Sequence, residues 1–333
     1  MAEGLQRHFG DVKAVDGVDL SVRDGEIFGF LGPNGAGKST TVRMLTTLLR
    51  PTGGKARVAG YDVVEQADEV RRRIGVALQD VAVDPLMTGS ELLDLQAVLY
   101  GIPKHIAKAR AHELLERVGL TGAADRRVGT YSGGMRRRLD LAMSLVHAPK
   151  VLFLDEPTTG LDPMSRLSLW EEVRRLNREG TTVLLTTQYL EEADQLADRV
   201  AIIDLGRIVK EGVPQQLKEA VGAPTLLIRV GQELEAAAEA VLHRFGEKRP
   251  GPDGTLGVGL RGGAGAMADV VRALDEASVQ VGTLELNAPS LDDVFAEATG
   301  HRLEGAARPP EAGAPAAGGR TGRRGRGRPG AAP

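Results

Sequence analysis

The sequence predicts a large α/β domain followed by a small α+β domain. Two observations support this prediction. From the N-terminus to about Gln216, apolar runs of strand length alternate with stretches of helix length, which is the order expected for a sheet covered by helices. After Gly212-Val213-Pro214 the pattern changes. With 333 residues, of which 42% are hydrophobic, the chain can bury one large core and a smaller one.

Each predicted element is a short apolar run or a stretch with helical spacing. In the first domain the strands are expected at residues 26–31, 73–79, 150–154, 181–187 and 200–204, and the helices at 39–49, 90–100, 106–118, 135–147 and 165–179. Pro149 and Gly180 mark the ends of the last two helices. In the second domain the strands are expected at 225–230, 255–260 and 279–286, and the helices at 233–245, 266–278 and 290–299.

A glycine-rich run, Gly32-Pro33-Asn34-Gly35-Ala36-Gly37-Lys38-Ser39, lies between the first predicted strand and the first predicted helix. The glycines let successive backbone N–H groups point into one concavity around the α and β phosphates of a nucleotide. Lys38 can reach the β and γ phosphates, and the Ser39 hydroxyl can ligate Mg²⁺. A plain glycine turn is the alternative interpretation. Because strand, loop and helix stand in the required order, the run predicts binding and hydrolysis of a nucleoside triphosphate.

Two carboxylates end the predicted strand at residues 150–154. Asp155 and Glu156 follow four apolar residues, so they lie beside the phosphate loop if the sheet is parallel. Asp155 is expected to hold Mg²⁺ through water, and Glu156 to polarise the attacking water. The alternative is an acidic pair that only precedes a turn, and the phosphate loop upstream favours the catalytic interpretation.

A second glycine-rich segment, Tyr131-Ser132-Gly133-Gly134-Met135, opens the helix expected at residues 135–147. Ser132 is a suitable cap, and the two glycines leave backbone amides free for a phosphate. Together with the following Arg136-Arg137-Arg138-Leu139-Asp140-Leu141-Ala142 and the acidic strand, this segment resembles the signature of ATP-binding-cassette ATPases. The resemblance covers about residues 5 to 216.

The resemblance implies a P-loop NTPase fold, with a RecA-like core and a helical subdomain, that binds ATP and Mg²⁺. It also implies that the signature of one protomer caps the nucleotide of another, so that hydrolysis requires a homodimer. The implied nucleotide-binding residues are Phe9, Gly32, Pro33, Asn34, Gly35, Ala36, Gly37, Lys38, Ser39, Thr40, Ser132, Gly133, Gly134 and Asp162.

The same resemblance gives roles to individual residues. Phe9 is the aromatic residue that stacks on adenine, although a lone Phe is also typical of a core. Gln79 senses Mg²⁺ and water and faces the membrane partner, and Asp162 contacts the opposite protomer. The implied metal ligands are Ser39, Gln79 and Asp155, and the implied catalytic residues are Glu156, Gln188 and Gln79.

Gln188 departs from the cassette pattern, in which a histidine usually contacts the γ phosphate. A carboxamide can donate a hydrogen bond to that phosphate, but it does not titrate near neutral pH. This leaves Glu156 as the expected base. The signature also differs, with Tyr131 in place of the usual leucine and Met135 in place of the usual glutamine.

These departures resemble one subgroup of cassettes. The runs TTQYLEEAD and YSGGMRRRLDLA, and the closing Pro289-Ser290-Leu291-Asp292-Asp293-Val294-Phe295, are similar to those of the ATPase subunits of daunorubicin/doxorubicin-type drug-resistance exporters. The resemblance implies a separate integral membrane permease subunit and a location on the inner face of the cell membrane. It predicts a cassette at residues 1–217, an accessory domain at 218–300 and a disordered tail at 301–333.

Composition excludes several other functions. The chain has no cysteine, so disulfides, thiolate metal sites and cysteine nucleophiles are excluded, and its six histidines form no metal-binding pattern. We expect a cytoplasmic protein, because neither a spanning run nor a secretory signal is present. Residues 302–333 carry seven Arg and two Glu, so the rest of the chain carries a net charge of −8. No nucleic-acid partner is therefore expected. The arginines of the tail could contact anionic lipid or RNA, but the tail is interpreted as a solvated terminus.

Two other functions remain open at this point. The first is a cassette ATPase that acts on DNA or ribosomes instead of on a transporter. However, DNA-repair cassettes carry a long coiled-coil insertion, whereas Lys38 and Ser132 are only 94 residues apart, and ribosomal cassettes come in pairs on one chain. The second is a regulatory protein with an inactive site, which the presence of Lys38, Ser39, Asp155 and Glu156 disfavours.

Overall fold

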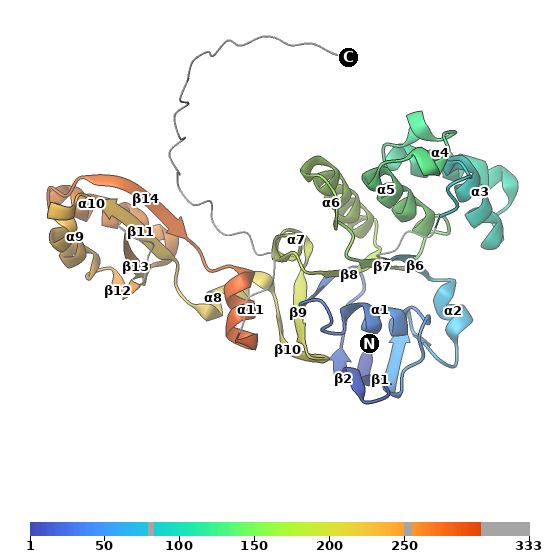
Figure 1. Cartoon of the computed structure of the whole chain (residues 1–333), viewed down its shortest axis with the longest axis horizontal. Helices are drawn as coiled ribbons and strands as arrows, with labels where there is room; N and C mark the ends of the chain where they lie inside the picture. The colour runs from blue at the N-terminus through green and yellow to red at the C-terminus, as the bar shows by residue number, and fades with distance from the viewer. Residues whose placement is uncertain (79–82, 250–254, 301–333) are drawn as a thin grey trace, which may run out of the picture.

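The computed structural model describes residues 1–78, 83–249 and 255–300. A six-stranded sheet of order β10-β9-β3-β8-β7-β6 forms the centre of the first domain (Figure 1). Its strands are β3 (Ile27–Leu31), β6 (Ile74–Ala77), β7 (Val151–Asp155), β8 (Thr182–Thr187), β9 (Arg199–Asp204) and β10 (Arg207–Gly212). The first five are parallel neighbours, and β10 pairs antiparallel at the edge. The prediction of an α/β domain is confirmed, because the five predicted strands are the five parallel ones.

Helices enclose this sheet, which explains why β3 and β8 consist entirely of buried residues. The helices next to the sheet include α1 (Lys38–Leu45), α2 (Ala67–Arg71), α6 (Pro163–Arg178) and α7 (Leu190–Leu196). Helix α1 ends four residues before the predicted end at residue 49. Thr47 takes a left-handed backbone conformation, with φ 65°, which no helix continues.

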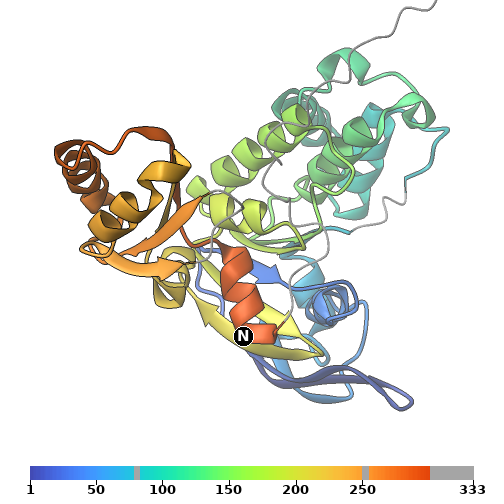
Figure 2. The same ribbon diagram turned by 60° about the vertical axis from the view of Figure 1, so that its left-hand side comes forward.

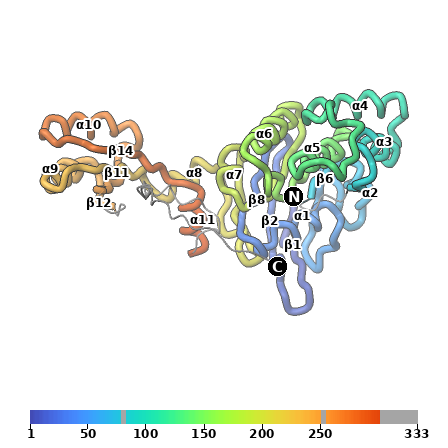
Figure 3. Tube along the Cα trace, turned by 45° about the horizontal axis from the view of Figure 1, so that its top comes forward, coloured from blue at the N-terminus to red at the C-terminus, as the bar shows by residue number. Residues whose placement is uncertain are grey.

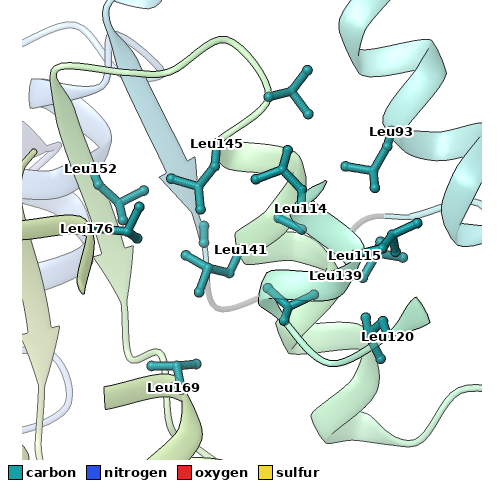
Figure 4. Packing of buried hydrophobic residues seen from close by; sticks show 14 of the residues in the cluster. Leu93, Leu114, Leu115, Leu120, Leu139, Leu141, Leu145, Leu152, Leu169 and Leu176 are labelled. Atoms are coloured by element: carbon teal, nitrogen blue, oxygen red, sulfur yellow. The ribbon is translucent and has the colours of Figure 1, made fainter. Parts of the chain in front are cut away.

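A leucine-rich core joins the sheet to three further helices, α3 (Gly89–Leu99), α4 (Lys104–Arg117) and α5 (Gly133–Ser144). Figure 4 shows leucines of α5 between those of α3 and α4 on one side and Leu152 of β7 on the other. The first turn of α3 is a capping box, in which Thr88 and Glu91 each accept a hydrogen bond from the other's backbone N–H. These three helices form the predicted helical subdomain.

An antiparallel sheet of order β2-β1-β4-β5 covers the other side of α1. Its strands are β1 (Ala2–Phe9), β2 (Val12–Leu20), β4 (Gly53–Val58) and β5 (Tyr61–Asp62). The sequence pattern did not predict this sheet, because Gly4 and Gly17 interrupt the alternation in β1 and β2, and β5 has only two residues. The apolar side chains that do alternate, such as Leu5, Val15 and Val18, are buried in a core that β3 shares.

The C-terminal domain, residues 225–287, is a β-α-β-β-α-β unit. It contains β11 (Thr225–Val230), α9 (Glu235–Leu242), β12 (Gly246–Arg249), β13 (Leu256–Leu260), α10 (Met267–Glu276) and β14 (Val281–Asn287). All its strands pair antiparallel, in the order β12-β13-β11-β14, and α9 and α10 share a separate core with the sheet. Short 3₁₀ turns lie at Gln232–Leu234 and Gly263–Ala266 in this domain, and at Thr121–Ala123 and Val128–Thr130 in the first domain. Figure 3 shows this domain as a lobe set apart from the first domain.

Two helices connect the lobes, α8 (Pro214–Val221) before the C-terminal domain and α11 (Leu291–Thr299) after it. Helix α11 contacts the connecting helix α8, and it also contacts α7 and β10 of the first domain (Figure 2). The predicted boundary between residues 217 and 218 falls inside α8. The predicted tail at 301–333 lies outside the described residues.

Candidate functional site

The phosphate loop lies between β3 and α1, as predicted. Gly35 and Gly37 have φ values of 82° and 109°, which side chains rarely allow. A Cβ at Gly32 would lie 2.3 Å from the Ile203 carbonyl oxygen, and one at Gly37 would lie 2.5 Å from that of Ala14. Both positions therefore need glycine, since the backbone of neighbouring strands approaches too closely for any side chain.

Helix α1 begins without a side-chain cap. Its N-cap, Gly37, is left-handed and has no side chain that could accept a hydrogen bond, so backbone N–H groups of the first turn remain available to an anion. The helix dipole favours a negative charge at the same place. The loop is thus shaped and charged to hold phosphate.

Lys38 is buried at this loop. Its Nζ donates hydrogen bonds to the carbonyl oxygens of Gly32 at 2.7 Å and Pro33 at 3.1 Å, and it lies 3.6 Å from Glu156 Oε1. Burial lowers the pKa of Lys38, while the carboxylates of Glu156 and Asp155 oppose that shift. The ammonium group is therefore next to the predicted base.

Asp155 connects the ends of three structural elements. Its Oδ1 accepts hydrogen bonds from the hydroxyl of Ser39 in α1, at 3.1 Å, and from the hydroxyl of Thr186 in β8. The carboxyl group is buried. The structure thus brings together the two predicted metal ligands that it describes, Ser39 and Asp155. The third, Gln79, lies outside the described residues.

Glu156 has an unusual backbone conformation, with φ 49°. Its N–H donates to both the carbonyl oxygen of Thr186, at 3.0 Å, and the Thr186 hydroxyl, at 3.1 Å. Its Oε2 accepts a weak hydrogen bond, at 3.4 Å, from Thr159. The abrupt change of direction after β7 therefore separates the roles of the two carboxylates, with Asp155 turned to Ser39 and Glu156 turned to Lys38.

Gln188 follows β8 directly and is half-buried. Strand β8 lies between β3 and β7, with Thr187 opposite Leu31 and Thr186 opposite Asp155. Gln188 is therefore on the edge of the sheet where the phosphate loop and the acidic pair also lie. Behind it, the buried Glu192 accepts a hydrogen bond from Trp170 Nε1 at 3.1 Å. Burial raises the pKa of Glu192, and the nearby hydroxyls of Thr187 and Thr158 and the hydrogen bond from Trp170 oppose the shift.

The signature segment begins α5, with Ser132 as the N-cap accepting a hydrogen bond from Met135 N at 3.2 Å. This confirms the predicted cap. Ser132 and Gly133 are exposed, and Figure 1 places the start of α5 with the helical subdomain, away from α1. Asp162 is also exposed and caps α6 through Ser165, whose hydrogen bonds lower the pKa of its carboxyl.

Phe9 lies at the end of β1 and is 47% exposed, so it is not a core residue. The Arg7 guanidinium stacks on one side of its ring, 4.4 Å from the ring centroid. An exposed ring suits a stacking role.

Three site residues were not predicted from the sequence: Thr186, Glu192 and Arg137. Each is buried and contacts a predicted residue or its neighbours. Threonine in a strand and glutamate or arginine in a helix are common, so no signal in the sequence distinguishes them.

The fold and the site together define a P-loop ATPase of the ATP-binding-cassette type. A family model described as ABC transporter matches residues 15–159. The daunorubicin resistance ATP-binding protein DrrA2 of Streptomyces coeruleorubidus is 49% identical over 307 residues, which cover 91% of this chain and 95% of that protein. The Nod factor export ATP-binding protein I of Ralstonia nicotianae is 39% identical over 316 residues, covering 90% and 94%.

Solved structures of ATP-binding cassettes also match this chain. A dimeric ATP-binding cassette in a post-hydrolysis state, bound to ADP and Pi, matches with a TM-score of 0.59 and 25% identity, over 64% of this chain and 97% of that chain. The ATP-binding subunit of an ABC transporter matches with a TM-score of 0.61 and 26% identity, over 66% and 91%. The chain belongs to the ABC transporter family, in the group of the daunorubicin/doxorubicin resistance ATP-binding proteins, and it is an ATPase. The family resemblance of the motifs is confirmed.

Proposed function

We propose that this chain is the ATPase subunit of a drug exporter, in which two copies bind ATP between them and drive a separate membrane permease. The convergence of Lys38, Asp155 and Glu156 at one edge of the sheet carries the proposal, because it joins a phosphate-binding cation, a metal ligand and a base. The named relatives are resistance and export proteins, which favours transport over action on DNA or ribosomes.

Within this proposal the residues divide the work. The loop amides and Lys38 bind the β and γ phosphates, and Gln188 positions the γ phosphate. Glu156 aligns the attacking water and accepts its proton. Lys38 now bonds the carbonyls of its own loop, so it must exchange these bonds for phosphate oxygens when ATP binds.

The Ser39 hydroxyl and the Asp155 carboxylate fit Mg²⁺, since both are hard oxygen ligands that share one hydrogen bond. Bound there, Mg²⁺ would neutralise charge on the phosphates. Gln79 is proposed as a further ligand. Phe9 is proposed to stack on adenine, while Ser132, Gly133, Gly134 and Asp162 serve the partner's nucleotide. The exposure of Ser132, Gly133 and Asp162 on this chain supports that role.

The location of the subunit relative to the membrane is also part of the proposal. Among the described residues no helix is long and apolar enough to cross a bilayer. We place the subunit at the inner face of the cell membrane, held there by the permease.

Replacement of the base tests the proposal. Glu156→Gln keeps the shape of the side chain but removes the base. We expect ATP binding to persist, hydrolysis to fall roughly 100-fold or more, and a nucleotide-bound dimer to accumulate, as measured by phosphate release and light scattering. Wild-type rates in this variant would remove Glu156 as the base. Co-purification of a polytopic membrane protein with the tagged chain tests the partner.

A further inference from the structure

We propose that Arg137 is a positioning residue for hydrolysis, which holds the backbone on both sides of Glu156 and so sets the direction of that carboxylate. This inference rests on the proposed role of Glu156 as the base.

The hydrogen bonds of Arg137 carry the inference. Arg137 belongs to α5, and its side chain is buried. Its Nε donates to the Pro157 carbonyl oxygen at 3.0 Å, and its Nη2 donates to the Asp155 carbonyl oxygen at 2.6 Å. These two carbonyls flank Glu156 in the sequence. One planar guanidinium therefore spans the residue that carries the base.

Glu156 needs such support because its backbone is in the left-handed region, with φ 49°. A non-glycine residue in that region costs on the order of 1 kcal/mol or more, and it persists only where its surroundings fix it. The two hydrogen bonds from the Glu156 N–H to Thr186 fix one side of the kink. The Arg137 guanidinium fixes the carbonyl on each side of it.

The third hydrogen bond of Arg137 connects α5 to the end of a second strand, β6. Its Nη1 donates to the carbonyl oxygen of Leu78, which follows β6. Arg137 thus joins the helix of the signature segment to the ends of two neighbouring strands, β6 and β7. A shift of α5 would be transmitted to the backbone around Glu156, because the fork of the guanidinium is rigid.

The neighbouring arginines show that position, not charge alone, matters. Arg136 is exposed, and Arg138 donates to the Val118 carbonyl oxygen at 2.9 Å, within the helical subdomain. Only Arg137 of this run points toward the acidic strand. Lysine carries its three donors on a single nitrogen, so it lacks the planar fork by which Arg137 reaches the carbonyls of Asp155 and Pro157 from two separate nitrogens.

The test compares Arg137→Lys and Arg137→Gln with the control Arg136→Gln in the full chain with its membrane partner. We expect kcat to fall roughly 10- to 100-fold in both Arg137 variants, as expected when a reacting group is misplaced. ATP affinity, measured with a fluorescent analogue, should change less than about threefold. Arg136→Gln should match wild type.

A double variant decides whether Arg137 acts through Glu156. In single-turnover experiments, adding Arg137→Lys to Glu156→Gln should cause no further loss, because the base is already absent. A further loss of the same size would overturn the proposal, and so would unchanged kcat in both single variants. Loss of ATP binding or folding in both would show a structural role only and would also overturn it. Wild-type rates in Glu156→Gln alone would instead contradict the proposed function.

Discussion

The cassette and the C-terminal domain differ in what fixes their residues. In the cassette the backbone itself dictates residue type, as at Gly32 and Gly37, where a neighbouring carbonyl lies within 2.5 Å of any added Cβ. In the C-terminal domain the backbone also restricts residue type, at Gly246, where an added Cβ would lie 1.7 Å from the Gly259 carbonyl oxygen, but this approach only lets β12 and β13 pair. Its helices α9 and α10 present apolar faces to the sheet, which many sequences can do. The restricted glycines therefore indicate function in the cassette and only fold in the C-terminal domain.

Helix α11 belongs to neither region by sequence alone. It follows the C-terminal domain in sequence, but Leu291, Val294 and Phe295 are buried against the cassette. The same cluster contains Leu31, which precedes the phosphate loop, and Leu190, which follows Gln188 by two residues. Helix α11 thus completes the core that adjoins the phosphate loop and the loop of Gln188.

The strongest test of the comparison is Gly37→Ala. At φ 109°, with a Cβ 2.5 Å from the Ala14 carbonyl oxygen, alanine must displace the loop. We expect ATP hydrolysis to fall by about 100-fold or more, since the loop positions the substrate. The control is Gly122→Ala, because a Cβ there meets no atom within 4 Å. Equal activity in the two variants would show that backbone shape does not restrict this loop.

The next largest effect is expected for Phe295→Ala. The side chain is fully buried, and such truncations cost about 3–5 kcal/mol of unfolding free energy. The loss should appear in the cassette, so ATP should bind more weakly at elevated temperature, as measured by thermal unfolding with and without nucleotide.

The matched control is Leu274→Ala, which truncates a buried residue of the core that α9 and α10 share with their sheet. It should destabilise the C-terminal domain and leave ATP binding unchanged. If Phe295→Ala behaved in the same way, α11 would belong energetically to the C-terminal domain.

The sequence predicted the elements that repeat an apolar pattern and the site residues that chemistry demands. The five parallel strands and the positions of Lys38 and Asp155 follow from such patterns. The N-terminal sheet could not be predicted in this way, because Gly4 and Gly17 have positive φ values and shift the pairing register that alternation would show. Thr186 and Arg137 were missed because their roles arise from contacts between residues far apart in the sequence. Thr186 contacts Asp155 of the neighbouring strand, 31 residues away, and Arg137 reaches from α5 to the carbonyl of Leu78, 59 residues away.

The smallest expected effect concerns Asp140, a partly buried carboxyl in the cassette. Burial raises its pKa to about 7, although Arg137, 3.7 Å away, lowers it. Because the folded pKa is above the unfolded one, the folded state keeps its proton between about pH 4 and pH 7 while the unfolded state loses it. Stability therefore falls as pH rises through this range, by at most about 4 kcal/mol.

Asp140→Asn should remove this pH dependence from the unfolding of the cassette. We expect little change at pH 4 and a gain of roughly 1–3 kcal/mol at pH 8, where the wild-type carboxylate is ionised and buried. Chemical unfolding monitored at the two pH values measures the difference. Asp275→Asn is the isosteric control, since that side chain is exposed on α10 of the C-terminal domain. A gain of equal size at both pH values would contradict the ionisation of Asp140 as its cause and point to packing.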